Sequence, residues 1–422
     1  MTDATTTTTP TTPPGRQGDD QGESRGSRLL RELTTGNAAI SVLAVVLALI
    51  VSGVLIAATD PDVQTTAGYL FARPSDFFQA LGDAVGGAYS SLFQGSVYNF
   101  RVDGFAAGIR PLTETLNYSV PLIAAGLGVA VAFRVGLFNI GARGQILIAA
   151  AAAGWVGFSF ELPAGVHLVL ALLAGIAGGA IWGGIVGLLK ARTGAHEVIL
   201  TIMLNYIAFY LISYLLRTPG LLQAEGSNNP KSPATLETAI LPGLFGSGYN
   251  LDLGFVVVIL LTVAVWWLLS RSTLGFRFRA VGENPHAART AGMNVKNVYL
   301  YAMLISGGLA GVAGSTQVLG TLTTGFSSGI DAGIGFDAIT VALLGRSRPW
   351  GVFGAGLLFG ALKAGGYSMQ AANGVPIDIV LVVQSLIVLF VAAPPLVRSI
   401  FRLPTPGARR ATPSTKEAVV TK

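Results

Sequence analysis

Residues His167–Leu189 read HLVLALLAGIAGGAIWGGIVGLL, and this stretch decides the fold class. Its 23 residues include no Asp, Glu, Lys or Arg, and about 20 apolar residues in helical form span the hydrocarbon core of a bilayer. Glycine recurs at every fourth position, which places small residues on one face, where a second helix can approach closely. The stretch therefore predicts a membrane helix packed against another helix. The repeated glycines are Gly175, Gly179, Gly183 and Gly187.

Similar apolar blocks recur along most of the chain. We expect an all-α, polytopic transmembrane protein with about ten membrane segments, in a range of eight to ten. The block at 335–344 is short, which favours a re-entrant or broken helix over a full crossing. The other predicted segments are Ala38–Ala58, Tyr118–Phe133, Ile146–Phe160, His167–Leu189, Val198–Leu216, Phe255–Leu269, Val298–Leu319, Val352–Ala364 and Ile377–Ala393.

The basic residues orient these segments. With the N-terminus inside, 21 of the 27 Lys and Arg residues fall in cytoplasmic segments and 5 outside, as the positive-inside rule requires. Both termini are then cytoplasmic. The 21 Arg against 6 Lys, with much Ala and Gly, indicate a GC-rich bacterial genome, so the membrane is expected to be a bacterial plasma membrane. This orientation accounts for the net charge of +6 without nucleic acid as a partner. Charged residues make up 11% of the chain, against about 25% in soluble domains.

Composition divides the chain into a membrane domain and two tails. Residues 1–37, rich in Thr, Pro, Gly and Ser, predict a disordered cytoplasmic tail. Residues 38–396 form the transmembrane domain. Within it, an amphipathic segment at about 60–115 is expected on the outer surface, and a cytoplasmic loop at about 270–297. Residues 397–422 form a second cytoplasmic tail.

Catalytic chemistry is not expected in this chain. It has no Cys, and its three His are far apart in the sequence, so we predict no metal site. No G-x-x-x-x-G-K-[ST] motif, catalytic triad or carboxylate pair occurs, so the protein should not hydrolyse nucleotide itself and should bind no cofactor. Few ionisable residues lie within the predicted segments (Asp337, Lys363 and Asp378, with Glu197 at an edge), which argues against a proton relay.

The stretch at 138–145, FNIGARGQ, interrupts apolar helix with polar and glycine residues. In lipid, Asn139 and Gln145 require partners from protein, water or substrate. A glycine-interrupted helix can present amides to a neutral polar ligand near the middle of the membrane. The alternative is a cytoplasmic turn between two segments, which Arg134 and Arg143 favour.

A second polar stretch runs from His196 to Tyr206. Glu197 opens a helix, where the helix dipole favours a carboxylate, and a structural role is expected for it. Thr201 and Asn205 lie one turn apart on one helix face. An Asn about two turns into an apolar segment should face a substrate path or form a hydrogen bond between helices.

A third stretch, between Ser270 and Leu300, contains a short helix with defined ends. Asn284 can cap this helix, with Pro285 at its first position, and Gly292 closes it. A short helix with small side chains between basic residues suits docking into the groove of another protein. Without a partner, it is simply a capped loop helix.

Together these stretches resemble the permeases of bacterial ATP-binding-cassette importers in the branched-chain amino acid, ribose and simple-sugar group, most closely the subgroup that imports nucleosides. Residues 138–145 (FNIGARGQ) and 197–208 (EVILTIMLNYIA) are similar to the subgroup's FNIG-x-x-GQ and EVI-x-TIMLNYIA. Residues 279–293 (RAVGENPHAARTAGM) resemble the group's cytoplasmic coupling segment. Residues 335–362 (GFDAITVALLGRSRPWGVFGAGLLFGAL) resemble its GFDGIAVALLG-x-x-x-P-x-G. The likeness covers about residues 115–395.

This resemblance implies partners and a source of energy. It implies a cytoplasmic ATPase that uses the ATP, and a second, related permease subunit in a heterodimer rather than a homodimer. It also implies an extracytoplasmic substrate-binding lipoprotein, with membrane lipid around the permease. A permease for simple sugars or other small solutes is the first alternative, and a secondary transporter is the second. One position departs from the pattern, because members often carry an acidic residue where Arg143 stands.

The resemblance also assigns residues to two sites. The contact with the ATPase is expected at Glu283, Asn284, Ala287, Ala288, Gly292 and Met293. The candidates for the substrate path are Asn139, Gln145, Thr201, Asn205, Tyr206, Phe336 and Asp337.

Overall fold

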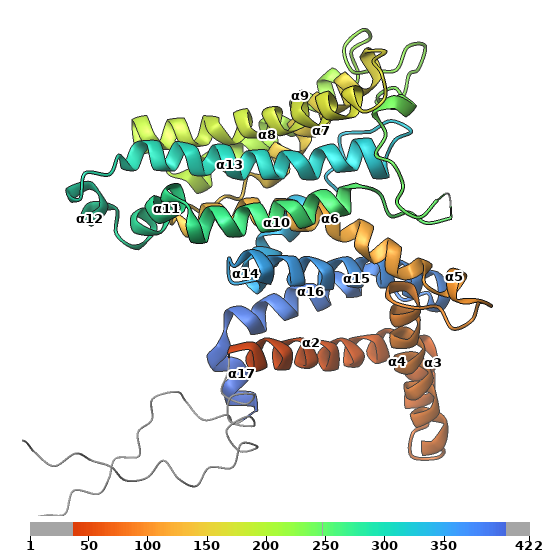
Figure 1. The fold of residues 1–422 in the computed structure, drawn as a ribbon. Helices are drawn as coiled ribbons and strands as arrows, with labels where there is room; N and C mark the ends of the chain where they lie inside the picture. Colours follow the sequence, from red (N-terminus) through yellow and green to blue (C-terminus); the bar gives the residue numbers. More distant parts are fainter. Residues whose placement is uncertain (1–36, 247, 402–422) are drawn as a thin grey trace, which may run out of the picture.

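The computed structural model describes residues 37–246 and 248–401. These residues form helices and connecting loops, with no β-strand among them, and each of the ten predicted apolar blocks contains a helix (Figure 1). The predicted tails, 1–37 and 397–422, lie almost entirely outside the described residues. The long helices are α2 (Asn37–Thr59), α4 (Pro74–Ser96), α6 (Arg110–Arg134), α7 (Ala142–Ser159), α8 (Val166–Thr193), α9 (Glu197–Leu215), α10 (Gly254–Arg271), α13 (Val295–Thr316), α15 (Pro349–Asn373) and α16 (Ile377–Ala392).

Shorter helices occupy the connections and ends. Most of the long helices run in roughly the same direction, and α11 and α12 protrude together at one end of the bundle (Figure 1). We call this the coupling end. The short elements are α3 (Pro61–Ala67), α5 (Phe105–Gly108), the 3₁₀ turn η1 (Glu237–Ala239), α11 (Thr273–Glu283), α12 (Pro285–Thr290), the π-turn η2 (Gln317–Thr321), α14 (Ile334–Leu344) and α17 (Pro394–Ile400).

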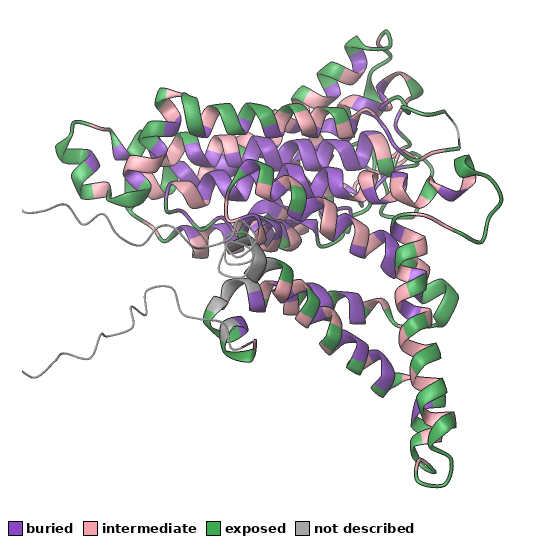
Figure 2. Ribbon diagram, turned by 60° about the horizontal axis from the view of Figure 1, so that its bottom comes forward, coloured by how far each residue is buried: buried purple, intermediate pink, exposed green. Residues whose placement is uncertain are grey.

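The glycine face of α8 packs against α13, as the spacing predicts. A Cβ added at Gly179 would lie 2.4 Å from the carbonyl oxygen of Gly307, and one at Gly307 would lie 2.2 Å from that of Gly179. The backbones of α8 and α13 are thus in direct contact, which only glycine allows. Helices α6 and α13 are the most thoroughly buried, and they form the centre of the core (Figure 2).

Six described helices are long and apolar enough to cross a membrane by themselves. Two blocks, α14 and α16, are apolar but shorter. Helix α14 has 11 residues, a length of about 16 Å, which is about half of the hydrocarbon thickness. The irregular residues 322–333 precede it. The block at 335–344 is therefore the helical half of a broken segment.

Most of the predicted outer segment, residues 60–109, forms an arm between α2 and α6. Helix α4 lies across the direction of the long helices, beside one end of α2 (Figure 1). The hydroxyl of Tyr89 on α4 donates to the carbonyl of Leu49 on α2. A Cβ at Gly365 on α15 would lie 2.4 Å from the carbonyl oxygen of Leu92, so α4 also packs tightly on α15. A helix lying crosswise at a helix end has the geometry of an interfacial segment.

Candidate functional site

The chain between α6 and α7, residues 135–141, is not helical, and we call this interruption the break. The side chain of Asn139 holds the break in place. This residue is 1% exposed, and its Oδ1 accepts from the amide of Gly141 at 2.8 Å. Its Nδ2 donates to the hydroxyl of Ser306 on α13 at 2.8 Å and to Oε1 of Gln145 at 3.2 Å. The Ser306 hydroxyl in turn donates to the carbonyl of Gly128 on α6 at 2.7 Å. Three helices are thereby joined through one buried amide.

Helix α9 closes the other side of the break. Oδ1 of Asn205 accepts from the amide of Gly144 at 2.8 Å, and its Nδ2 donates to the carbonyl of Ile140 at 2.9 Å. Both groups belong to backbone that the interrupted helix leaves without internal partners. Thr201, one turn earlier and fully buried, packs against Gly141 and donates to the carbonyl of Val198 at 2.9 Å. Of the two interpretations of Asn205, the geometry favours the hydrogen bond between helices.

This break lies well inside the bundle, away from the coupling end. Asn205 lies eight residues into α9 and Ser306 eleven residues into α13, which is about 12 and 16 Å along helices that begin at the coupling end. Asn139 and Gln145, each 1% exposed, are therefore near the middle of the bundle. The chain turns back into the protein after α6 and starts α7 there. Irregular backbone at this depth is possible because protein surrounds it.

Arg143, which favoured a cytoplasmic turn in the sequence, lies at this break and not at the coupling end. Its Nε lies 3.3 Å from Oδ2 of Asp331, and its guanidinium lies 5.2 Å from the ring centre of Phe209 on α9. A Cβ at Gly335 would lie 2.5 Å from the backbone of Arg143, so the start of α14 packs directly on the start of α7. The two broken helices meet at their N-termini.

Asp331 was missed by sequence reasoning because it lies in the irregular backbone before α14, outside every predicted segment. Its position two residues before Gly333, which caps α14 with a φ of +79°, was the available signal. Nearby, Oδ2 of Asp337 lies 3.9 Å from the amine of Lys363, which donates to the carbonyl of Ala332 at 3.0 Å. Two ion pairs thus stand at the junction of α7 and α14.

The candidates for the substrate path fall into two groups. Asn139, Gln145, Thr201 and Asn205 are buried, and the two Asn side chains form the bonds that hold the break. Tyr206 and Phe336 are 56% and 50% exposed, on the surfaces of α9 and α14, and Asp337 is half-buried. The structure brings the first group together and leaves Tyr206 and Phe336 facing outward.

No group of three or more His, Asp or Glu residues in the described ranges could hold a metal ion.

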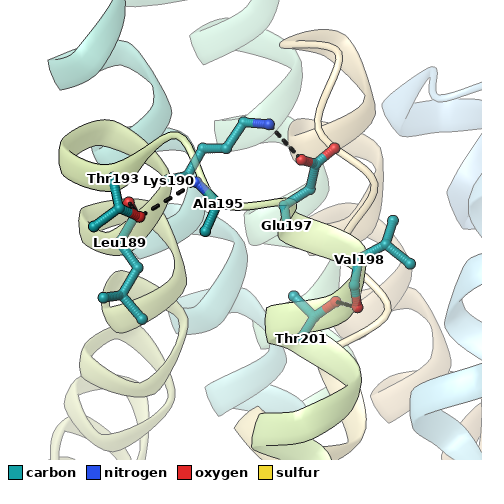
Figure 3. A network of polar contacts seen from close by, with 7 residues as sticks. All are labelled: Leu189, Lys190, Thr193, Ala195, Glu197, Val198 and Thr201. Carbon is teal, nitrogen blue, oxygen red and sulfur yellow. Dashed lines mark hydrogen bonds and ion pairs between the residues drawn. The ribbon is translucent and has the colours of Figure 1, made fainter.

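Glu197 forms a structural contact between α8 and α9. The amine of Lys190 donates to its Oε2 at 2.6 Å, across the short connection between the two helices (Figure 3). Gly194 turns the chain there with a φ of +71°, and the hydroxyl of Thr193 accepts from the amide of Ala195 at 3.3 Å. The carboxylate therefore fixes the angle at which α9 enters the bundle.

At the coupling end, α12 has the ends that the sequence predicts. Oδ1 of Asn284 accepts from the amides of His286 and Ala287 at 3.0 and 3.1 Å, with Pro285 at the first helical position. Gly292 closes the helix with a φ of +82°. Among the residues assigned to the ATPase contact, Glu283, Asn284, Ala287 and Gly292 are exposed, Met293 is half-buried and Ala288 is buried against the bundle.

Helix α11 connects α12 to the end of α6. A Cβ at Gly282 would lie 2.2 Å from the carbonyl oxygen of Arg134, so the last turn of α11 rests directly on the last turn of α6. The irregular residues 135–141 begin at that point and lead to Asn139. Direct contacts thus lead from α12 through α11 and the end of α6 to the break.

Comparisons with known proteins show to which proteins the chain is similar. Residues 112–392 match the family described as the permease component of branched-chain amino acid transport systems. The chain is 42% identical to the guanosine permease NupP of Bacillus subtilis over 74% of this chain and 87% of that protein. It is 40% identical to the glucose permease TsgB13 of Haloferax volcanii, over 66% and 75% of the two chains.

Two further relatives are informative. The nucleoside permease NupB of Lactococcus lactis is 34% identical over 73% of this chain and 85% of its own length. A second guanosine permease of Bacillus subtilis, NupQ, is 28% identical over 58% and 78% of the two chains. No solved structure matches the chain.

Proposed function

The chain belongs to the family of permease components of branched-chain amino acid transport systems, and from this membership we propose that it is the membrane-spanning subunit of an ATP-driven importer of nucleosides. The observation that carries the substrate is the 42% identity to a guanosine permease over 87% of that protein. The similarity to NupB supports the same class. A sugar is the second candidate, because the glucose permease TsgB13 is 40% identical.

The chemistry of the site suits a neutral, polar solute. Near the middle of the bundle, the charged groups of Arg143 and Asp331 are paired with each other, as are those of Asp337 and Lys363. A nucleoside, with hydroxyls and ring nitrogens but no charge, can be bound by hydrogen bonds without separating these pairs. The four buried candidates for the substrate path, Asn139, Gln145, Thr201 and Asn205, then hold the break in place. We propose that the substrate passes along the outward-facing Tyr206 and Phe336.

We propose that a cytoplasmic ATPase pushes on the coupling helix α12. The exposed Ala287 and Gly292 present a small-residue surface that a groove can receive. The contact of Gly282 with the end of α6 carries the displacement to the break at 135–141. On this account α12 and both termini are cytoplasmic, in the plasma membrane of a bacterium, and the arm at 60–109 lies on the outer surface.

A second permease subunit is expected to cover the junction of α7 and α14. Arg143 and Lys363 remain partly exposed there, at a depth where exposure of a charge to lipid is costly. The presence of two related guanosine permeases in Bacillus subtilis supports a heterodimer. An extracytoplasmic lipoprotein that delivers the nucleoside would complete the importer.

Uptake by the reconstituted importer tests this function. Proteoliposomes that contain the permease pair and the ATPase, with the lipoprotein supplied on the opposite side, should accumulate labelled guanosine only when ATP is supplied on the ATPase side. Unlabelled nucleosides should compete, and glucose or ribose should not. Competition by free sugars would favour the sugar permease. Uptake that survives without ATP and disappears with the proton gradient would refute ATP coupling.

A further inference from the structure

A second polar feature lies at the coupling end, away from the break. A cavity of about 550 Å³ opens between the ends of α6 and α10, helix α11 and the start of α15. Three arginines line it together with two tryptophans, and we call it the arginine pocket. Its lining residues are Arg134, Arg279, Arg348, Trp266, Trp350, Leu269, Ser270, Pro349 and Gly351.

The charge of the arginine pocket is not neutralised within the described chain. Arg279 and Arg348 lie close enough to Arg134 for mutual repulsion. None of the ion pairs found among the described residues involves any of the three arginines. Nε of Arg134 donates to the carbonyl of Ser347 at 3.0 Å, a neutral partner. Three like charges around one cavity create a positive potential that attracts an anion.

The walls of the pocket change character along the helices. Trp266 and Trp350 are 41% and 51% exposed, and the ring centre of Trp350 lies 5.9 Å from that of Phe353, one turn further into the bundle. Phe353 in turn faces Phe255 on α10 at 6.3 Å. The arginines therefore stand at the helix ends, and an aromatic surface continues from them along α10 and α15. Tryptophan beside arginine at a helix end is typical of the boundary between head groups and acyl chains.

We propose that the arginine pocket binds the head group of an anionic phospholipid from the cytoplasmic leaflet. The phosphate would accept hydrogen bonds from the guanidiniums, and the acyl chains would lie along the aromatic surface of α10 and α15. Basic pockets between membrane helices on the cytoplasmic side bind such head groups. Because the pocket adjoins α11, the bound lipid would also hold the coupling segment against the membrane.

Tryptophan quenching measures this binding directly. The chain has five Trp, and replacing the three outside the pocket with Phe leaves Trp266 and Trp350 as reporters. The protein is placed in phosphatidylcholine nanodiscs that contain increasing fractions of brominated phosphatidylglycerol. We expect preferential quenching by phosphatidylglycerol over brominated phosphatidylcholine. Each arginine near the membrane surface raises the affinity for anionic lipid about fivefold. Arg279→Gln combined with Arg348→Gln should therefore weaken the preference for phosphatidylglycerol over phosphatidylcholine about 25-fold.

Two further variants control for fold and for overall charge. Arg279→Lys with Arg348→Lys keeps the charge and should retain most of the preference. Arg271→Gln with Arg277→Gln removes the same charge from the neighbouring cavity and should leave the preference unchanged.

Three outcomes would overturn the proposal. The first is an equal loss of preference in the Arg271 and Arg277 double variant, which would indicate general electrostatic attraction. The second is displacement of the lipid by inorganic phosphate alone, which would indicate a free-anion site. The third is a loss of bound ATPase in the Arg279 and Arg348 variant without a change in lipid preference, which would assign the arginines to carboxylates of that partner.

Discussion

Replacement of Asn205 by Leu tests the role of the break most sharply. Leu is branched at the same carbon as Asn, although it is larger, and it can form neither of the two hydrogen bonds that Asn205 makes. The change leaves the amide of Gly144 and the carbonyl of Ile140 buried without partners. Each unsatisfied buried group costs about 1–3 kcal/mol, which gives about 2–6 kcal/mol of lost stability. We expect the lower end, because a chain unfolded within the membrane also finds partners for its polar groups.

Thermal unfolding in detergent measures this effect, and the adjacent residue supplies the control. Tyr206→Leu removes an exposed side chain that makes no hydrogen bond within the described structure. Asn205→Leu should lower the Tm by several degrees, whereas Tyr206→Leu should leave the Tm unchanged and impair uptake. Equal Tm values for the two variants and the wild type would refute the assignment of Asn205 to the break.

Three other predictions follow from the packing, the ion pairs and the loops. Gly179→Leu should abolish monodisperse protein in size-exclusion chromatography, because its Cβ would lie 2.4 Å from a carbonyl oxygen of α13, whereas Gly354→Ala, with nothing within 4 Å, should behave as the wild type. Arg143→Gln leaves the buried Asp331 without its counter-charge and should lower the free energy of unfolding by about 3 kcal/mol, and adding Asp331→Asn should restore most of the loss. Burial raises the pKa of Asp252, in the loop before α10, to about 6. The protonated carboxyl of Asp252 therefore stabilises the folded state in full below about pH 4, and this stabilisation is lost as the pH rises through 6. Asp252→Asn should raise the Tm more at pH 7 than at pH 5, and an equal rise at both would contradict this.

The sequence predicted the helices well because the bilayer imposes their length and composition. The run at 167–189 needed only apolar residues and spaced glycines, and its partner α13 was found in contact through Gly179 and Gly307. The capped helix α12 was equally accessible, because Asn284, Pro285 and Gly292 act within a few residues of the chain.

The candidate site was predicted only in part, because its contacts join distant segments. Asn139 and Asn205 were identified as unusual in an apolar context, but the choice between substrate and neighbouring helix depended on Ser306 and the backbone at 140–144. Arg143 favoured a cytoplasmic turn because a basic residue beside a glycine turn is typical of a cytoplasmic loop. Its partner Asp331 lies 188 positions away along the chain, in backbone without periodicity, so no local pattern could connect the two.

The side of the membrane that α12 faces decides whether ATP can drive this transporter. The chain has no Cys, so Ala287→Cys introduces a single thiol at an exposed position of α12. Membrane vesicles that carry this variant without the ATPase, which would cover position 287, are treated with a membrane-impermeant maleimide in both orientations. The account predicts labelling in inside-out vesicles and none in right-side-out vesicles. Labelling of intact right-side-out vesicles would place α12 outside the cell and contradict ATP-driven import.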